Sequence, residues 1–318
     1  MIYGRSISHR MADCLYLILP LMLVISWVTF LIMYPPIKKK QVITEHQSRI
    51  IEIEAEKFNG TSTYRIKRKI NLSETVAYVD MWRSHWCTYY NDREFFFTPR
   101  INEMLQRLRQ FDVPVVTISS VVDQYLPGSK QRIKGLKAIE KGRLPVLEEY
   151  NARQMAYHDE YIPGFDDICM YDGLDRYGPT RDNRFTPKIA LSEKDYFSSN
   201  FKESAECFVG LGAKTVIVFG QHTNMCLMAV FLYCQQVGLD LIIVRDLTDG
   251  CWVYPLQKDH VNTHTKGNVA TNNYFNQKFG CSIISFDLFR SLRQISPSIE
   301  KPKYQYFLKT THMFRNFL

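Results

Sequence analysis

The stretch KTVIVFGQHTNMC, from Lys214 to Cys226, decides which fold this chain can form. Its apolar run, Thr215 to Phe219, predicts a buried strand that ends at Gly220. An apolar helix is expected over about residues 224–237, so Cys226 would lie in its first turn. Backbone N–H groups and the positive end of the helix dipole favour the thiolate there, which is the nucleophilic form of cysteine. The stretch therefore predicts a cysteine nucleophile on a strand–turn–helix.

Two other segments place charged residues beside predicted strands. The strand Thr75–Asp80 ends in a carboxylate, and the carboxyl ends of parallel strands open onto the ligand crevice of an α/β sheet. Farther along, Ile189–Leu191 is a predicted strand, and Lys194 follows it. A helix capped by Ser198 or Ser199 is expected next.

These segments resemble the isochorismatase-like cysteine hydrolases, a superfamily that includes nicotinamidases and N-carbamoylsarcosine amidases. The family's Gly-x-x-Thr-(Asp/Asn)-x-Cys turn is similar to Gly220–Cys226. A bacterial branch has an Asp-Met-Trp-x-x-His-Trp-Cys signature, which is similar to Asp80–Cys87. Asp80, Lys194 and Cys226 also follow one another in the family's order, and the resemblance extends over about residues 75–289.

The resemblance implies acyl transfer through a thioester on Cys226, with a small amide or ureide as substrate. Asp80 would carry the proton, and Lys194 would supply the positive charge that stabilises the thiolate. The turn residues His222, Thr223 and Cys226 would form the oxyanion hole, with a cis peptide between the first two. The expected activity is hydrolysis of a non-peptide C–N bond without a cofactor.

Several residues beyond the strand ends are candidates for the substrate pocket, although core packing explains the first three at least as well: Trp82, His85, Trp86, Asp249, Tyr254 and His264. Nicotinamidases hold a metal through an Asp-x-His pair and a later histidine, but Thr117–Tyr125 contains no histidine. We therefore expect no catalytic metal, and nicotinamidase activity is disfavoured. Cys226 also disfavours hydrolysis of isochorismate, because those enzymes lack the cysteine.

The amino-terminal region predicts a membrane anchor. Leu15–Tyr34 contains no charged residue and is long enough to cross a bilayer as one helix. A cleaved signal peptide is disfavoured, because the run is too long and no small-residue cleavage site follows it. Lys38–Lys40 on one side and two arginines on the other leave the orientation open. A mitochondrial inner membrane and an endomembrane are both compatible with this pattern.

The chain is thus expected to contain a flank (1–14), a transmembrane helix (15–34), a polar linker (35–72), a hydrolase domain (73–289) with an insertion at about 121–187, and a basic tail (290–318). Alternating strands and helices predict a three-layer α/β/α fold with a mostly parallel, Rossmann-like sheet of about six strands. The strands are expected at 75–80, 113–119, 189–191, 215–219, 239–245 and 282–286.

Composition limits the partners. The hydrophobic fraction of 46% supports a sizeable core, and the net charge of +8 is unaccompanied by a nucleic-acid-binding motif. The eight cysteines show neither zinc-ligand spacing nor a disulfide framework. The expected partners are a small substrate, a lipid bilayer, and subunits of a membrane complex or further copies of the chain. The alternative to an enzyme is a catalytically silent accessory subunit of such a complex.

Overall fold

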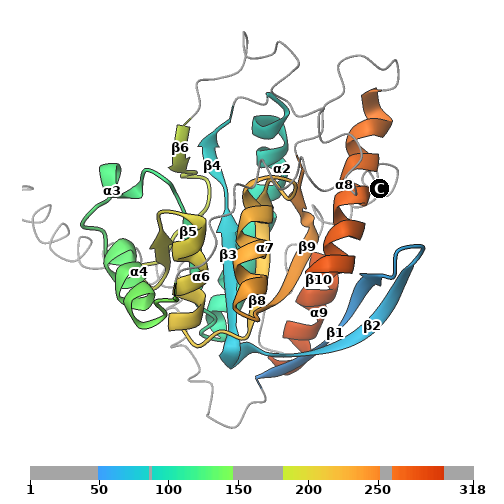
Figure 1. Ribbon diagram of the computed structural model, residues 1–318, viewed down its shortest axis with the longest axis horizontal. Coiled ribbons are helices and arrows are strands. Elements are labelled where there is room, and N and C mark those ends of the chain that lie inside the picture. The colour runs from blue at the N-terminus through green and yellow to red at the C-terminus, as the bar shows by residue number, and fades with distance from the viewer. Residues whose placement is uncertain (1–48, 86–87, 146–181, 251–259, 297–318) are drawn as a thin grey trace, which may run out of the picture. The chain divides into compact units, whose positions relative to one another are not determined.

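The computed structural model describes residues 49–85, 88–145, 182–250 and 260–296. They contain an eight-stranded sheet with the order β2-β1-β10-β9-β8-β3-β5-β7 (Figure 1). The six strands from β10 to β7 are parallel, and the hairpin β1–β2 adds two antiparallel strands at one edge. The predicted mostly parallel sheet is therefore confirmed. The strands of the large sheet are β1 (Ile50–Phe58), β2 (Thr63–Asn71), β3 (Thr75–Asp80), β5 (Val115–Ile118), β7 (Tyr196–Ser198), β8 (Thr215–Gln221), β9 (Asp240–Asp249) and β10 (Gly280–Ile283).

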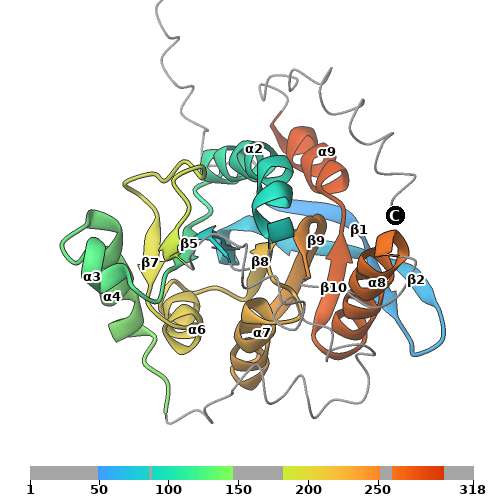
Figure 2. The same ribbon diagram turned by 90° about the horizontal axis from the view of Figure 1, so that it is seen from above.

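Helices cover both faces of this sheet, as the predicted three layers require (Figure 2). α2 (Thr88–Gln110) and α9 (Ser285–Ile295) pack on one face through buried side chains such as Leu105 and Leu292. The other face is covered by α4 (Lys130–Lys141), α6 (Phe201–Gly210), α7 (Cys226–Gln236) and α8 (His260–Lys278). The remaining elements are short: η1 (Leu72–Glu74), α3 (Val122–Tyr125), and β4 (Trp82–Ser84), which pairs with β6 (Asp182–Phe185) in a separate two-stranded sheet.

The central strands form where the sequence has continuous apolar runs. Every residue of β3 is buried, and in β8 all but the first residue are buried, because helices lie on both faces. β3 has the predicted bounds, and β8 runs two residues beyond its predicted end. β9 likewise continues to Asp249, four residues past the predicted strand. The candidate site residues therefore lie at the ends of well-packed strands.

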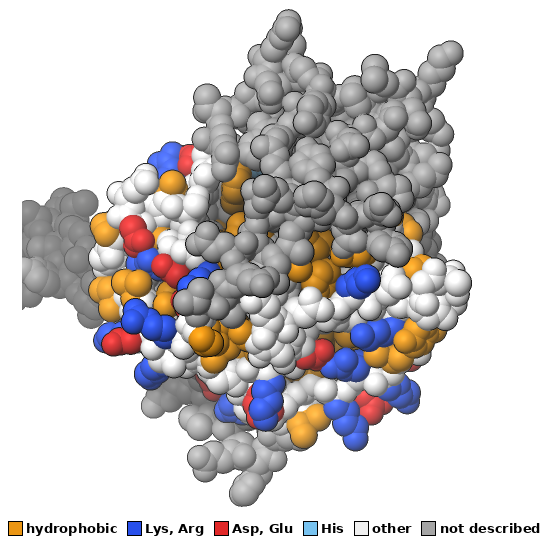
Figure 3. All heavy atoms as spheres, in the orientation of Figure 1, with side chains coloured by type: hydrophobic (Ala, Val, Ile, Leu, Met, Phe, Trp, Pro, Cys, Tyr) orange, Lys and Arg blue, Asp and Glu red, His pale blue; other side chains and the backbone are white. Residues whose placement is uncertain are grey.

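The prediction that residues 35–72 form a polar linker was wrong for residues 50–71, which form the hairpin β1–β2. In β1, buried Ile51 and Ile53 alternate with exposed glutamates. Those glutamates face basic side chains of β2, as in the Arg65–Glu54 pair at 3.6 Å. Charges of both signs are mixed over this region (Figure 3). The strand pattern was therefore present, but its high charge content resembled a linker.

Four other predicted boundaries were wrong. The strand after the insertion is β7 and not residues 189–191, and the insertion region contains α3, α4 and β6. The last strand ends at Ile283, because Ser285 begins α9 and donates its backbone N–H to Asp246 Oδ1 at 2.7 Å. Residues 290–295 of the predicted tail continue α9, and the helix that was expected to be capped by Ser198 or Ser199 begins at Phe201, after an Asn200 cap.

The predicted membrane helix at 15–34 lies outside the described residues, as do the flank before it and residues 35–48 of the linker. Within the described ranges, no helix combines the length and the apolar character that crossing a bilayer requires. The anchor therefore stays a prediction.

Candidate active site

Asp80 and Cys226 come together at the carboxyl edge of two neighbouring parallel strands. Asp80 is the last residue of β3 and pairs with Gly220 of β8, and the turn after β8 leads directly to Cys226. Tyr78 lies two residues before Asp80, so its side chain points to the same face of the sheet. Negative charge on Asp80 and on Cys226 raises the pKa of Tyr78, after burial as the largest cause. Tyr78 is thus a buried phenol on the same face of the sheet as Asp80.

Cys226 is the first residue of α7, with Met225 in the capping position. The helix was predicted to begin near residue 224, so the expected first-turn placement of the cysteine is confirmed. The next eight residues of α7 are buried, whereas Cys226 is half-buried. The packing of this apolar helix fixes its amino terminus against the sheet while its first side chain keeps partial access to solvent.

Asp80 is fully buried, and burial raises its pKa well above the ordinary range. Trp82 opposes this shift as a hydrogen-bonding neighbour, but it is the weaker influence. No lysine or arginine within the described residues lowers the pKa of this carboxyl. Burial therefore disfavours the charged form of Asp80.

The structure separates Lys194 from the other two predicted catalytic residues. Val79 of β3 is level with Thr117 of β5, which is level with Phe197 of β7. Lys194 therefore precedes this row by three residues, before β7 begins at Tyr196, whereas Asp80 follows the row by one residue. The two residues are also two strands apart, and Lys194 is exposed. The position of Lys194 therefore does not support its expected role in stabilising the Cys226 thiolate.

The contacts of the Asp195 side chain fix the position of the neighbouring Lys194. The Asp195 carboxylate accepts hydrogen bonds from Arg109 Nε at 3.0 Å and Nη2 at 2.6 Å, and from the Ser192 backbone N–H at 2.7 Å. Arg109 is near the end of α2, just before the chain enters β5. This ion pair therefore fixes residues 192–195 at the amino edge of the sheet, opposite the edge that carries Asp80.

Asp249 supports the nucleophile turn. Its carboxylate accepts from Gln221 Nε2 at 3.1 Å and from Asn268 Nδ2 at 2.6 Å, and its carbonyl oxygen accepts the Thr223 backbone N–H at 2.9 Å. Asp249, expected to line a pocket, thus positions the turn from β9. The Thr223 N–H is committed to this contact, which removes it as an oxyanion donor. The cis peptide joins Gln221 to His222, one residue earlier than predicted, because the turn begins directly after β8 ends at Gln221.

Two histidines from distant parts of the chain meet beside this turn. The rings of His85 and His222 lie edge to face with centroids 4.5 Å apart, and both residues are buried. Trp82 packs against His85, with their ring centroids 5.3 Å apart.

Three pocket candidates are not placed: Trp86 and Tyr254 lie outside the described residues, and for His264 only its position on α8 is described. In the part of the chain that the structure describes, no cluster of acidic, histidine and cysteine residues could hold a metal.

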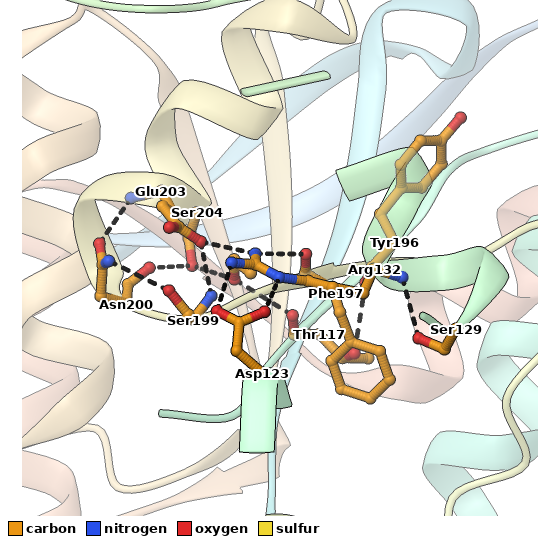
Figure 4. A network of polar contacts seen from close by, with 11 residues as sticks. Thr117, Asp123, Ser129, Arg132, Tyr196, Phe197, Ser199, Asn200, Glu203 and Ser204 are labelled. Carbon is orange, nitrogen blue, oxygen red and sulfur yellow. Dashed lines mark hydrogen bonds and ion pairs between the residues drawn. The ribbon is translucent and has the colours of Figure 1, made fainter. Parts of the chain in front are cut away.

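Arg132 of α4 links segments that follow β5 and β7 (Figure 4). Both strands run parallel to β3, so they end at the edge of the sheet that carries Asp80. Its guanidinium donates to both carboxylate oxygens of Asp123, at 2.6 and 2.8 Å, and to Glu203 at 2.7 Å. Glu203 also accepts the backbone N–H of Ser199, directly after β7, at 2.8 Å. This network was not predicted, since single charges in a basic stretch of sequence do not reveal their partners.

Asp80→Asn is expected to change how stability depends on pH. The folded-state pKa of Asp80 is above its unfolded value near 4, so between those values the native state binds more protons than the unfolded state. Wild-type stability contributed by this group is therefore lost as pH rises through that interval. The free energy of unfolding of the variant, minus that of wild type, should increase from pH 4 to pH 8 in urea titrations. A difference that does not change with pH would mean that Asp80 ionises normally.

Comparisons with known proteins identify similar solved structures. No family model and no curated protein sequence matches the chain. A cysteine hydrolase from Pseudomonas syringae pv. phaseolicola is 14% identical, with 71% of this chain and 95% of that one covered and a TM-score of 0.45. An N-carbamoylsarcosine amidase from Thermoplasma acidophilum is 11% identical (66% and 96% covered, TM-score 0.36). The MAR1 ribonuclease from Caenorhabditis elegans is also 11% identical (76% and 90% covered, TM-score 0.37). These similarities assign neither a substrate nor an activity to the chain.

Proposed function

We propose that this chain is a cysteine hydrolase that cleaves the C–N bond of a small amide or ureide through a thioester on Cys226. One observation carries the proposal: Asp80 and the first residue of the nucleophile helix meet at the carboxyl edge of adjacent strands. A half-buried thiol at a helix amino terminus is placed for attack, and the Asp80 carboxyl lies at the same edge of the sheet. The motif that resembles the isochorismatase-like hydrolases supports the same chemistry.

Alkylation of the full-length chain by iodoacetamide, resolved by site with peptide mass spectrometry, tests this proposal. At pH 7 we expect Cys226 to react about 100-fold faster than Cys207, Cys234 and Cys281, with a midpoint below the free-thiol pKa of about 8.5. Those three thiols are matched internal controls: burial raises the pKa of Cys207 to about 12 and that of Cys281 to about 11, and it raises the pKa of Cys234 further. In urea the selectivity should disappear. Small amides and ureides would then be screened with wild type and Cys226→Ala.

A catalytically silent accessory subunit is the second candidate, and a specific observation favours it. The lysine expected to stabilise the thiolate is at the opposite edge of the sheet, and burial raises the pKa of the Asp80 carboxyl. A folded wild-type protein whose Cys226 titrates as an ordinary thiol would support this candidate and exclude the hydrolase.

We also propose that residues 15–34 anchor the protein in a bilayer, on the ground of their uncharged, apolar sequence. The full-length chain should then remain in the membrane pellet after alkaline carbonate extraction, whereas a chain lacking residues 1–34 should be released. Release of both proteins would show that residues 15–34 do not anchor the chain, and it would leave the proposed thiol chemistry unaffected.

A further inference from the structure

One face of α4 fixes the helix beside β7, the last strand of the sheet. A Cβ atom added at Gly135 would be 2.0 Å from the carbonyl oxygen of Phe197, so the helix backbone lies directly against β7. After the last turn, a Cβ atom at Gly142 would be equally close to the carbonyl oxygen of Glu206 on α6. Ala138 is buried on the same face. The opposite face of α4 is therefore not needed to hold the helix in place.

The outward face of α4 combines lysines with aliphatic side chains. Lys130, Lys137 and Lys141 recur at the spacing that places side chains on one side of a helix, and all three are exposed. Ile133 and Leu136 lie beside them, and 43% and 45% of their surfaces are exposed. Apolar and basic side chains are accordingly neighbours on the molecular surface over α4 (Figure 3). We refer to these five residues as the lysine face of α4.

Positive charge exceeds negative charge on and around the lysine face. Glu140 is the one acidic residue of α4. Lys130 pairs with Glu193 at 2.8 Å, but the two side chains are 69% and 74% exposed, so water and salt weaken this pair. Lys134 and Lys194 add two further positive charges next to the face, where the Lys194 carbonyl oxygen accepts a hydrogen bond from Lys134 Nζ. The face therefore suits a partner with a dense negative charge and an apolar layer beneath it.

We propose that the lysine face of α4 is a docking surface for a lipid bilayer with anionic headgroups. The ammonium groups would attract the headgroups, while Ile133 and Leu136 would enter the boundary between headgroups and acyl chains. Lysine stems can lie along apolar surface while their charged ends stay in the polar layer. Single-stranded nucleic acids are instead typically held by aromatic side chains that stack on bases, whereas this face presents aliphatic ones. The proposal is independent of the thiol chemistry at Cys226.

The proposed membrane anchor would strengthen such docking without contributing a contact to it. Residues 35–48 separate the anchor from Arg49, the first described residue, and fourteen residues span at most about 50 Å. A tether of this length raises the effective concentration of the bilayer surface around the folded domain. A face with a few lysines and two aliphatic side chains can then dock although its own affinity is modest.

Lysine acetylation, resolved by site with peptide mass spectrometry, tests the proposal on the full-length chain. The chain is mixed with vesicles of phosphatidylcholine alone or of phosphatidylcholine with phosphatidylserine. With phosphatidylserine we expect Lys137 and Lys141 to react about fivefold more slowly, the factor that corresponds to the attraction of one lysine to an anionic surface. High salt should remove the difference. Lys67 and Lys69 of β2 are exposed internal controls, and their rates should be equal with both kinds of vesicle.

Variants separate the charge from the aliphatic contribution. Lys137→Glu should abolish the protection of Lys141, and Ile133→Ser should reduce it. Lys67→Glu is the matched control, because it makes the same change of charge on an exposed lysine of β2 and should leave the protection of Lys141 unchanged.

Three results on the wild-type chain would overturn the proposal, so the test does not depend on the folding of a variant. The first is equal acetylation of Lys137 and Lys141 with both kinds of vesicle. The second is slow acetylation of these lysines without vesicles, which would show that the protein itself covers the face. The third is protection by polyuridylic acid and not by phosphatidylserine, which would assign the face to nucleic acid. Selective alkylation of Cys226 in the same samples would show that the proposed function stands although the docking surface fails.

Discussion

Gly220→Ala should destabilise the protein by about 4 kcal/mol, since two costs of about 1–3 kcal/mol each act at this position. Gly220 has a φ of 106°, in the region that disfavours side chains. A Cβ atom there would also be 2.1 Å from the carbonyl oxygen of Asp80, on the neighbouring central strand. Relief would require β3 and β8 to separate where Asp80 and the nucleophile turn meet.

The expected loss can be checked by urea unfolding, with Gly238→Ala as the matched control. Gly238 has a similar left-handed φ of 72°, but nothing lies within 4 Å of the position that a Cβ atom would take there. The control should cost only about 1 kcal/mol, which isolates the contribution of the contact with Asp80. Equal losses in the two variants would show that β3 and β8 are less closely apposed than the structure indicates. Cys226 alkylation should also lose its selectivity in the Gly220 variant alone.

The central part of the fold was predictable because burial on both faces leaves a simple signal. Strands such as β3 and β8 are continuous apolar runs, and the helix that begins at Cys226 is apolar all round. The hairpin was missed for the opposite reason: β1 alternates Ile51 and Ile53 with glutamates that pair across to β2. Half-buried edge strands with charged outer faces resemble solvated linkers when only composition is considered.

The position of a site residue was predictable where the residue lies at the end of a strand or the start of a helix with a strong sequence signal. It was not predictable where it depended on how a short strand aligns with its neighbours in the sheet. Asp80 and Cys226 were placed correctly, because each is adjacent to a strong strand or helix signal. Lys194 was assigned from a resemblance, and a shift of the strand to Tyr196–Ser198 moved it from one edge of the sheet to the other. The contact between His85 and His222 joins residues far apart in the chain, which no local pattern reveals.

Arg132→Ala is expected to cost about 3–5 kcal/mol, the range for removing one partner of a buried ion pair. The Arg132 side chain is 3% exposed and Glu203 is 20% exposed, so the carboxylate left behind would lose its charge partner in a poorly solvated place. Asp123 is 55% exposed, and water can replace much of its interaction. The loss therefore comes mainly from Glu203, which also holds the Ser199 backbone at the end of β7.

Two further variants make the Arg132 measurement specific. Arg132→Lys keeps the charge but cannot donate to both Asp123 oxygens and to Glu203 at once, so it should recover only part of the loss. Arg184→Ala removes a pair with Asp182 in which the arginine is 44% exposed, and it should change stability by less than about 1 kcal/mol. Free energies of unfolding from urea titrations give all three values. If Arg132→Ala behaves like Arg184→Ala, the network does not hold the ends of β5 and β7, and α4 is attached through its packing on α6 and β7 alone.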